Sequence, residues 1–139
     1  MPKPRKILLV EDEEDELSSV KVGLEMRGFI VDAYHDPTLA LSGFKPGIYG
    51  IAILDIRMPN MNGFVLYRRL REIDPGLGVC FFTAFDVHER EFEMLFPELK
   101  AKALFRKPIR VDELALRLNQ LFLKEEAREF GRHPRGKDS

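Results

Sequence analysis

Short apolar runs alternate with longer, more polar segments five times along the chain. The runs lie at residues 6–10, 29–34, 50–54, 78–82 and 102–106. Apolar runs of this length that are bounded by Gly, Pro, Asn or Asp indicate buried strands. Strands that alternate with helices predict a parallel sheet with helices on both faces. We therefore expect an α/β fold with a doubly wound, five-stranded parallel sheet.

The segments between the first four runs show the spacing of helices. Leu17 and Leu24 lie on one helical face and predict a first helix, and Gly28 stands where that helix would end. A short second helix is expected at residues 38–44. A third helix is expected after Asn62, because asparagine is a favoured N-cap residue.

The last two predicted helices differ in regularity. The fourth has an apolar face that is interrupted by Pro97. Because proline removes a backbone hydrogen bond and clashes with the preceding turn, we expect this helix to end or kink near Phe96. The last helix is expected to begin near Val111. Residues 131–139 follow without an apolar pattern, and we expect them to be mobile.

Composition and charge narrow the class of protein. A chain of 139 residues with 45% hydrophobic residues is typical of one globular domain. The net charge of −1 gives no electrostatic reason to expect direct binding of nucleic acid or of an anionic membrane. The N-terminal segment has too few apolar residues for a signal peptide or a membrane span. The single cysteine, Cys80, lies in an apolar run, which predicts a small core residue and a cytoplasmic setting.

Acidic residues stand at the ends of two predicted strands. Glu11 and Asp12 follow the first strand, and Asp55 follows the third. Ligands of such sheets bind at the carboxyl ends of the strands, so we expect the three carboxylates to lie together. They would repel one another unless a cation lies among them, and oxygen ligands favour Mg²⁺, with Mn²⁺ tolerated. The alternative is a solvated acidic turn at a helix N-terminus, which we accept for residues 13–16.

Thr83 and Lys107 end the fourth and fifth predicted strands and extend the same candidate site. Most residues of these types have a plainer role, as a β-branched strand residue and as a surface lysine. At the acidic edge, however, the lysine is expected to pair with Asp55, and the threonine hydroxyl would gain a role if it faced that carboxylate.

Five separated segments carry a family resemblance. They are residues 7–13 (Ile-Leu-Leu-Val-Glu-Asp-Glu), 54–59 (Leu-Asp-Ile-Arg-Met-Pro), 62–63 (Asn-Gly), 83–84 (Thr-Ala) and 107–108 (Lys-Pro). In this order they resemble the receiver domains of response regulators in two-component signalling. The resemblance covers residues 5–124 and implies the flavodoxin-like strand order 2-1-3-4-5. Residues 125–139 would then form an extension of the last helix and a mobile tail.

The resemblance also implies roles for the candidate site. Asp55 would be the phosphoryl acceptor, and Thr83 and Lys107 would hold the phosphoryl oxygens. Magnesium would be bound by Asp12, Asp55 and the main-chain carbonyl of Arg57, with Glu11 acting through water. The donor would be a sensor histidine kinase or a histidine phosphotransfer protein, and the output would be a downstream protein target. Such a protein is a switch that undergoes phosphorylation and autodephosphorylation, not an enzyme that turns over an external substrate.

The fifth predicted strand departs from the family pattern. Receivers usually carry an aromatic residue three positions before the site lysine, and here that position is Leu104. The neighbouring Phe105 cannot replace it, because successive side chains of a strand point to opposite faces. We therefore expect the phosphorylation chemistry to be intact and the usual aromatic relay to be altered.

The last helix offers a candidate interaction surface. Leu116, Leu123 and Phe130 fall near one line outside the core-facing positions. Scattered surface apolar residues are common, but a docking or homodimer face would give the same pattern.

Other functions are compatible with parts of the pattern. A degenerate receiver could act only as a protein-interaction module, and the chain could be the input domain excised from a larger regulator. A hydrolase of the haloacid-dehalogenase type also uses an aspartyl phosphate. That chemistry needs a second acid two residues after the nucleophile, where this chain has Arg57.

Overall fold

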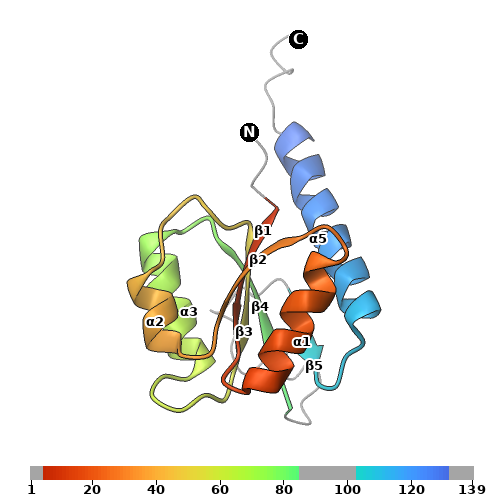
Figure 1. The fold of residues 1–139 in the computed structure, drawn as a ribbon. Helices are drawn as coiled ribbons and strands as arrows, with labels where there is room; N and C mark the ends of the chain where they lie inside the picture. The colour runs from red at the N-terminus through yellow and green to blue at the C-terminus, as the bar shows by residue number, and fades with distance from the viewer. Residues whose placement is uncertain (1–4, 85–102, 132–139) are drawn as a thin grey trace.

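The computed structural model describes residues 5–84 and 103–131 and contains a five-stranded parallel sheet (Figure 1). The strands are β1 (Lys6–Val10), β2 (Ile30–Tyr34), β3 (Ile51–Asp55), β4 (Gly78–Thr83) and β5 (Ala103–Arg106). The helices of the described residues are α1 (Glu14–Glu25), α2 (Pro37–Ser42), α3 (Gly63–Ile73) and α5 (Val111–Gly131). The strand order is β2-β1-β3-β4-β5, which confirms the predicted fold class and topology.

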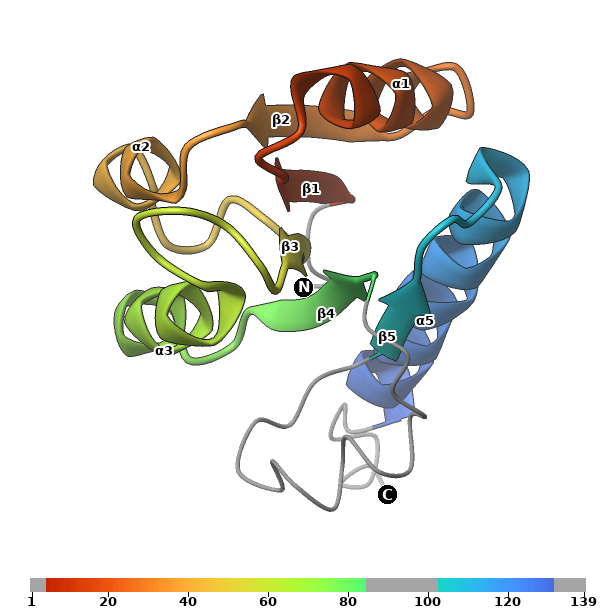
Figure 2. The same ribbon diagram turned by 90° about the horizontal axis from the view of Figure 1, so that it is seen from below.

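Helices cover both faces of the sheet. Figure 2 shows α2 and α3 on one side and α1 and α5 on the other. Alternate residues of β3 follow this division, since Leu54 belongs to the α2–α3 core and Ile53 to the α1–α5 core. All five residues of β3 are buried, as the central position of this strand requires.

The strand boundaries agree closely with the sequence prediction, whereas α2 ends at Ser42, two residues before its predicted end. Each strand begins and ends within one residue of the predicted run. The side chain of Asn62 accepts a hydrogen bond of 3.0 Å from the backbone N–H of Val65, which confirms the N-cap of α3. Gly28 follows α1 with a φ of 94°, a conformation that favours glycine. The predicted fourth helix and its Pro97 lie outside the described residues.

The strand β5 places its two large residues on opposite faces, as expected. Leu104 packs in the α2–α3 core, whereas Phe105 packs in the α1–α5 core. The ring of Phe105 lies 6.0 Å from that of Phe82, and the guanidinium of Arg117 lies 4.8 Å from the Phe105 ring centroid. The aromatic residue of β5 therefore lies on the α5 side of the sheet. Cys80 is buried in the same core, as predicted.

The helix α5 continues to Gly131, which was predicted to belong to the mobile tail, and Arg5 near the start of the chain contacts this helix. Arg5 donates hydrogen bonds of 3.1 Å to Glu126 and 3.0 Å to Asn119, and its guanidinium lies 5.2 Å from the ring centroid of Phe122. Leu116 and Leu123 on this helix are each 57% exposed.

The Phe130 side chain lies outside the described part of the chain, so the docking or homodimer face of α5 stays a prediction. No helix in residues 5–84 and 103–131 has the length and apolar character needed to cross a membrane.

Candidate functional site

Three carboxylates lie together at the carboxyl edge of the sheet. Glu11 and Asp12 follow β1, and Asp55 is the last residue of the neighbouring strand β3. One carboxylate oxygen of each residue lies within 4.8 Å of those of the other two. Glu11 is 2% exposed and Asp55 is 5% exposed, whereas Asp12 is more open to solvent. The structure thus brings together the three acids that the sequence predicted to be neighbours.

Lys107 reaches this cluster from the far edge of the sheet. Its backbone N–H donates a 2.8 Å hydrogen bond to the carbonyl oxygen of Thr83, which holds the start of the β5–α5 loop against β4. Its ammonium nitrogen lies 2.6 Å from Glu11, 3.0 Å from Glu16 and 3.3 Å from Asp55. The expected pairing of Lys107 with Asp55 is present, and the peptide bond that joins Lys107 to Pro108 is cis.

Glu16 belongs to the site, although the sequence analysis placed it in a solvated helical turn. That placement is incomplete, because Glu16 lies in the first helical turn with its side chain 40% exposed, yet its carboxylate also pairs with Lys107. Glu16 lies in the first turn of α1, directly before the buried Leu17. Helical spacing gave no signal for this contact, because Asp12 precedes α1 and Lys107 comes from a distant segment.

Burial and mutual repulsion disfavour the ionised forms of the buried carboxylates. Burial raises the pKa of Glu11 to about 7, and the charge of Asp55 adds to this, although the hydrogen bond from Lys107 opposes it. Burial also raises the pKa of Asp55 above its usual range. Burial by itself would lower the pKa of Lys107, but hydrogen bonds to Glu11 and Glu16 outweigh it and raise that pKa. The cluster would therefore be stabilised by added positive charge.

The donor set fits a small, hard divalent cation. Carboxylate oxygens on Glu11, Asp12 and Asp55 are close enough to surround one ion. Mg²⁺ and Mn²⁺ prefer such oxygen ligands, and the exposure of Asp12 leaves room for the water molecules that Mg²⁺ retains.

Thr83 lies at the same edge, as the last residue of β4. It is 2% exposed and pairs with Arg106 in the register of β4 and β5. Alternation along β4 places it on the face that carries Phe81, which is the α2–α3 face. Thr83 is thus near the acids along the sheet edge, and its role there stays a prediction.

Gly63 allows α3 to pack directly on the backbone that carries Asp55. Its N–H donates a 2.9 Å hydrogen bond to the carbonyl oxygen of Ile56. A Cβ atom at this position would collide with the carbonyl oxygen of Asp55 and would lie 3.0 Å from the Cα of Ile56. Both obstacles are backbone atoms, which cannot move aside as the end of a flexible side chain can.

Gly63→Ala is therefore expected to reduce stability by about 2 kcal/mol, within the range for overpacked sites, and to weaken Mg²⁺ binding by displacing Asp55. Urea unfolding and magnesium titration would measure the two effects. Gly43→Ala is the matched control, because its Cβ would first meet the hydroxyl of Tyr34 at 3.2 Å. A Gly63→Ala protein as stable as the Gly43→Ala protein would contradict the packing argument.

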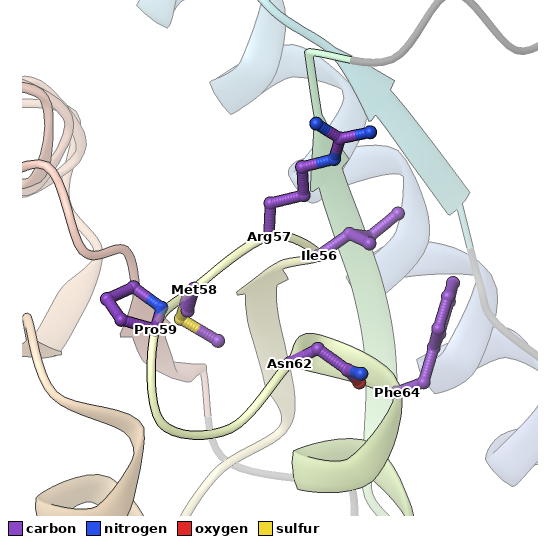
Figure 3. Close-up of a pocket in the computed structure, with 6 residues that line it drawn as sticks. All are labelled: Ile56, Arg57, Met58, Pro59, Asn62 and Phe64. Carbon is purple, nitrogen blue, oxygen red and sulfur yellow. The ribbon is translucent and has the colours of Figure 1, made fainter.

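A pocket lies beside the loop that follows β3 (Figure 3). Its lining residues are Ile56, Arg57, Met58, Pro59, Asn62 and Phe64. None of the three clustered carboxylates is among them. The Arg57 side chain extends from the loop toward the end of β4. We place the candidate site at the carboxylates, and the use of the Arg57 carbonyl as a metal ligand stays a prediction.

A family model and a solved structure match this chain over most of its length. The model of the response regulator receiver domain matches residues 7–119. The response regulator receiver domain protein (CheY-like) from Methanospirillum hungatei JF-1 superposes with a TM-score of 0.79 at 22% identity, over 91% of this chain and 99% of that chain. At this identity the superposition shows a shared fold.

Two longer bacterial proteins are also similar. The chain is 34% identical over 119 residues to the transcriptional regulatory protein CusR of Escherichia coli (strain K12), covering 84% of this chain and 50% of CusR. It is 32% identical over 112 residues to the uncharacterized transcriptional regulatory protein YkoG of Bacillus subtilis (strain 168), covering 81% of this chain and 48% of YkoG. The chain thus spans about half the length of these relatives.

Proposed function

The chain belongs to the response regulator receiver domain family of two-component systems, and from this premise we propose that Asp55 accepts a phosphoryl group in a Mg²⁺-dependent reaction. The observation that carries the proposal is the setting of Asp55, which is buried at a strand end with Lys107 3.3 Å away and two further carboxylates beside it. Receiver domains are signalling switches, so the product would be a change of state and not a released metabolite.

In the proposed step, a carboxylate oxygen of Asp55 attacks the phosphorus of a phosphohistidine. The new O–P bond forms while the P–N bond breaks, and the leaving imidazole nitrogen keeps the electron pair. Phosphoryl transfer mainly requires positioning and neutralisation of charge. Lys107 is held where its ammonium can donate to phosphoryl oxygens added to Asp55, and the hydroxyl of Thr83 would hold another of these oxygens.

Receiver domains bind Mg²⁺ at an acidic site, and the cluster of Glu11, Asp12 and Asp55 suits that ion. We assign direct binding to Asp12, Asp55 and the carbonyl oxygen of Arg57, with Glu11 acting through water and Mn²⁺ as a substitute. Bound magnesium would neutralise negative charge on the phosphoryl group.

Receiver domains interact with sensor kinases and with downstream effectors. We propose that the donor here is a sensor histidine kinase or a histidine phosphotransfer protein and that the phosphorylated form binds a downstream protein. The buried free thiol of Cys80 fits the reducing cytoplasm, where we place this exchange. Leu104 packs in the core and has neither a ring nor a hydroxyl. A movement of Thr83 on phosphorylation would therefore be passed on differently from the usual aromatic relay.

Incubation with acetyl phosphate tests the proposal. Intact-mass spectrometry should show one added phosphoryl group in Mg²⁺ and none in excess EDTA, and peptide mapping should place it on Asp55. Asp12→Ala should shift the Mg²⁺ requirement to concentrations at least about tenfold higher, because a charged ligand is lost. Absence of labelling in the wild type would favour a receiver that acts only by protein interaction, and sustained phosphate release from a phosphomonoester would favour a hydrolase.

A further inference from the structure

The ammonium group of Lys107 is shared among three carboxylates. A lysine ammonium has three N–H donors. The structure gives this one three acidic neighbours, at 2.6 Å for Glu11, 3.0 Å for Glu16 and 3.3 Å for Asp55. The longest of these contacts is the one to Asp55. In this state the ammonium thus lies closer to Glu11 and Glu16 than to Asp55, the residue that would carry a phosphoryl group.

Glu16 differs from the other two partners in origin and exposure. Glu11 and Asp55 are fixed at strand ends, and their side chains are 3% and 7% exposed. Glu16 comes from α1, and its side chain is 40% exposed. A partly exposed carboxylate can exchange its ion pair for water at little cost, whereas a buried one cannot. Glu16 is therefore the partner that Lys107 can most readily release.

We propose that Glu16 is a positioning residue that competes with a phosphoryl group for Lys107, and this inference rests on the proposed phosphorylation of Asp55. A phosphoryl group on Asp55 would present new acceptor oxygens to an ammonium that already has three partners. Each hydrogen bond that Glu16 retains is one that the phosphoryl group lacks. The carboxylate of Glu16 thereby weakens the hold of the site on a phosphoryl group and biases the switch toward its resting state.

The test uses beryllium fluoride, which mimics a phosphoryl group on an aspartate without a covalent step. Its affinity is measured at saturating Mg²⁺ for the wild type and for Glu16→Gln. The variant should bind about three- to fivefold more tightly, the size expected for the loss of one partly exposed ion pair. Binding of Mg²⁺ alone should not tighten, because the substitution removes a negative charge. A general gain in stability would not tighten the binding of beryllium fluoride while leaving the binding of Mg²⁺ no tighter.

Two further variants separate the contact from the charge. Asp15→Asn removes a charge from the same turn at an exposed residue and should change the beryllium fluoride affinity by less than about twofold. Glu16→Asp keeps the charge but shortens the side chain, so it should also tighten binding. Equal affinities of Glu16→Gln and wild type, an equal effect of Asp15→Asn, or a Glu16→Asp protein that behaves as wild type would each overturn the inference.

Binding of beryllium fluoride by the wild type distinguishes failure of the proposed function from failure of the role of Glu16. A wild-type protein that does not bind beryllium fluoride at Asp55 would overturn the phosphorylation of Asp55, and the role of Glu16 with it. A wild-type protein that binds it, combined with an unaltered Glu16→Gln, would overturn the role of Glu16 alone.

Discussion

Asp55→Asn is expected to abolish phosphorylation by acetyl phosphate and to stabilise the fold at the same time. An amide lacks the nucleophilic oxygen that the proposed reaction requires, so intact-mass spectrometry should detect no phosphoryl adduct. Stability should rise because the raised pKa of Asp55 shows that its charged form is held unfavourably. Lys107 keeps two carboxylate partners, Glu11 and Glu16, and is not left unpaired.

The expected gain from Asp55→Asn is about 1 kcal/mol in Mg²⁺-free buffer, or roughly 4 °C in the melting temperature. The gain should shrink or reverse in Mg²⁺, because the wild type binds the ion more tightly. Asp15→Asn is the matched control, since it makes the same change at an exposed residue and should alter neither quantity. A phosphoryl adduct on Asp55→Asn would place the acceptor elsewhere, and a lower melting temperature in EDTA would contradict the electrostatic account of this edge.

Lys107→Ala is expected to destabilise the protein by about 2–3 kcal/mol at pH 8 in EDTA, because it leaves buried carboxylates without their cation. The Lys107 side chain is only 15% exposed and contacts both Glu11 and Asp55. Saturating Mg²⁺ should restore much of the loss, since an ion that binds only the folded state stabilises it. Thermal unfolding with and without the ion measures both effects.

The cost of Lys107→Ala should depend on pH in a defined direction. The folded-state pKa of Glu11, about 7, lies above its ordinary value of 4.5. The folded protein therefore retains a proton that the unfolded chain has lost, and the penalty is absent below about pH 4.5 and complete above about pH 7. Without Lys107, which lowers this pKa, the penalty should grow, so the variant should lose more stability than the wild type between pH 5 and about pH 8.

Lys21→Ala provides the control for Lys107→Ala. Lys21 pairs with Glu25 on the surface of α1, and its side chain is 37% exposed. Loss of such a pair should cost less than about 1 kcal/mol and should respond neither to Mg²⁺ nor to pH in this range. Similar behaviour of the two lysine variants would mean that the acidic edge does not depend on Lys107.

The fold and the proximity of the three acids were predictable from two things. These are the local pattern of apolar residues and the rule that parallel strands end at one edge of the sheet. Buried parallel strands are marked by continuous apolar runs, as at residues 51–54, and their carboxyl ends meet at one edge. Glu11 and Asp12 are the first two residues after β1, and Asp55 is the last residue of β3. Their proximity therefore follows from strand adjacency alone, without knowledge of any side-chain conformation.

The contact of Glu16 with Lys107 could not be obtained in this way. It depends on how α1 is rotated over the sheet and on how far the Lys107 side chain reaches across β4. Neither quantity is encoded in a short window of sequence, because both are set by packing between segments separated by 91 residues. Within a run of six acids, the favourable effect of the helix dipole on negative charge at a helix N-terminus also supported the solvated interpretation of residues 13–16.

The opposite orientation of Leu104 and Phe105 was predicted correctly, because strand alternation is a strict geometric rule. The altered relay at Leu104 stays a prediction, because the segment after Ala84 lies outside the described residues. On the α5 side, the ring of Phe82 contacts that of Phe105, and the ammonium of Lys107 lies 5.8 Å from the Phe82 ring centroid.

The reach of Lys107 has a mechanical consequence. This residue directly follows the edge strand β5, yet its ammonium contacts acids at the ends of β3 and β1, which lie beyond β4 in the sheet. These ion pairs therefore connect β5, an outer strand of four residues, to the two central strands of the sheet. The proposed phosphorylation of Asp55 would redirect this ammonium and would therefore also change how firmly β5 is held to the sheet.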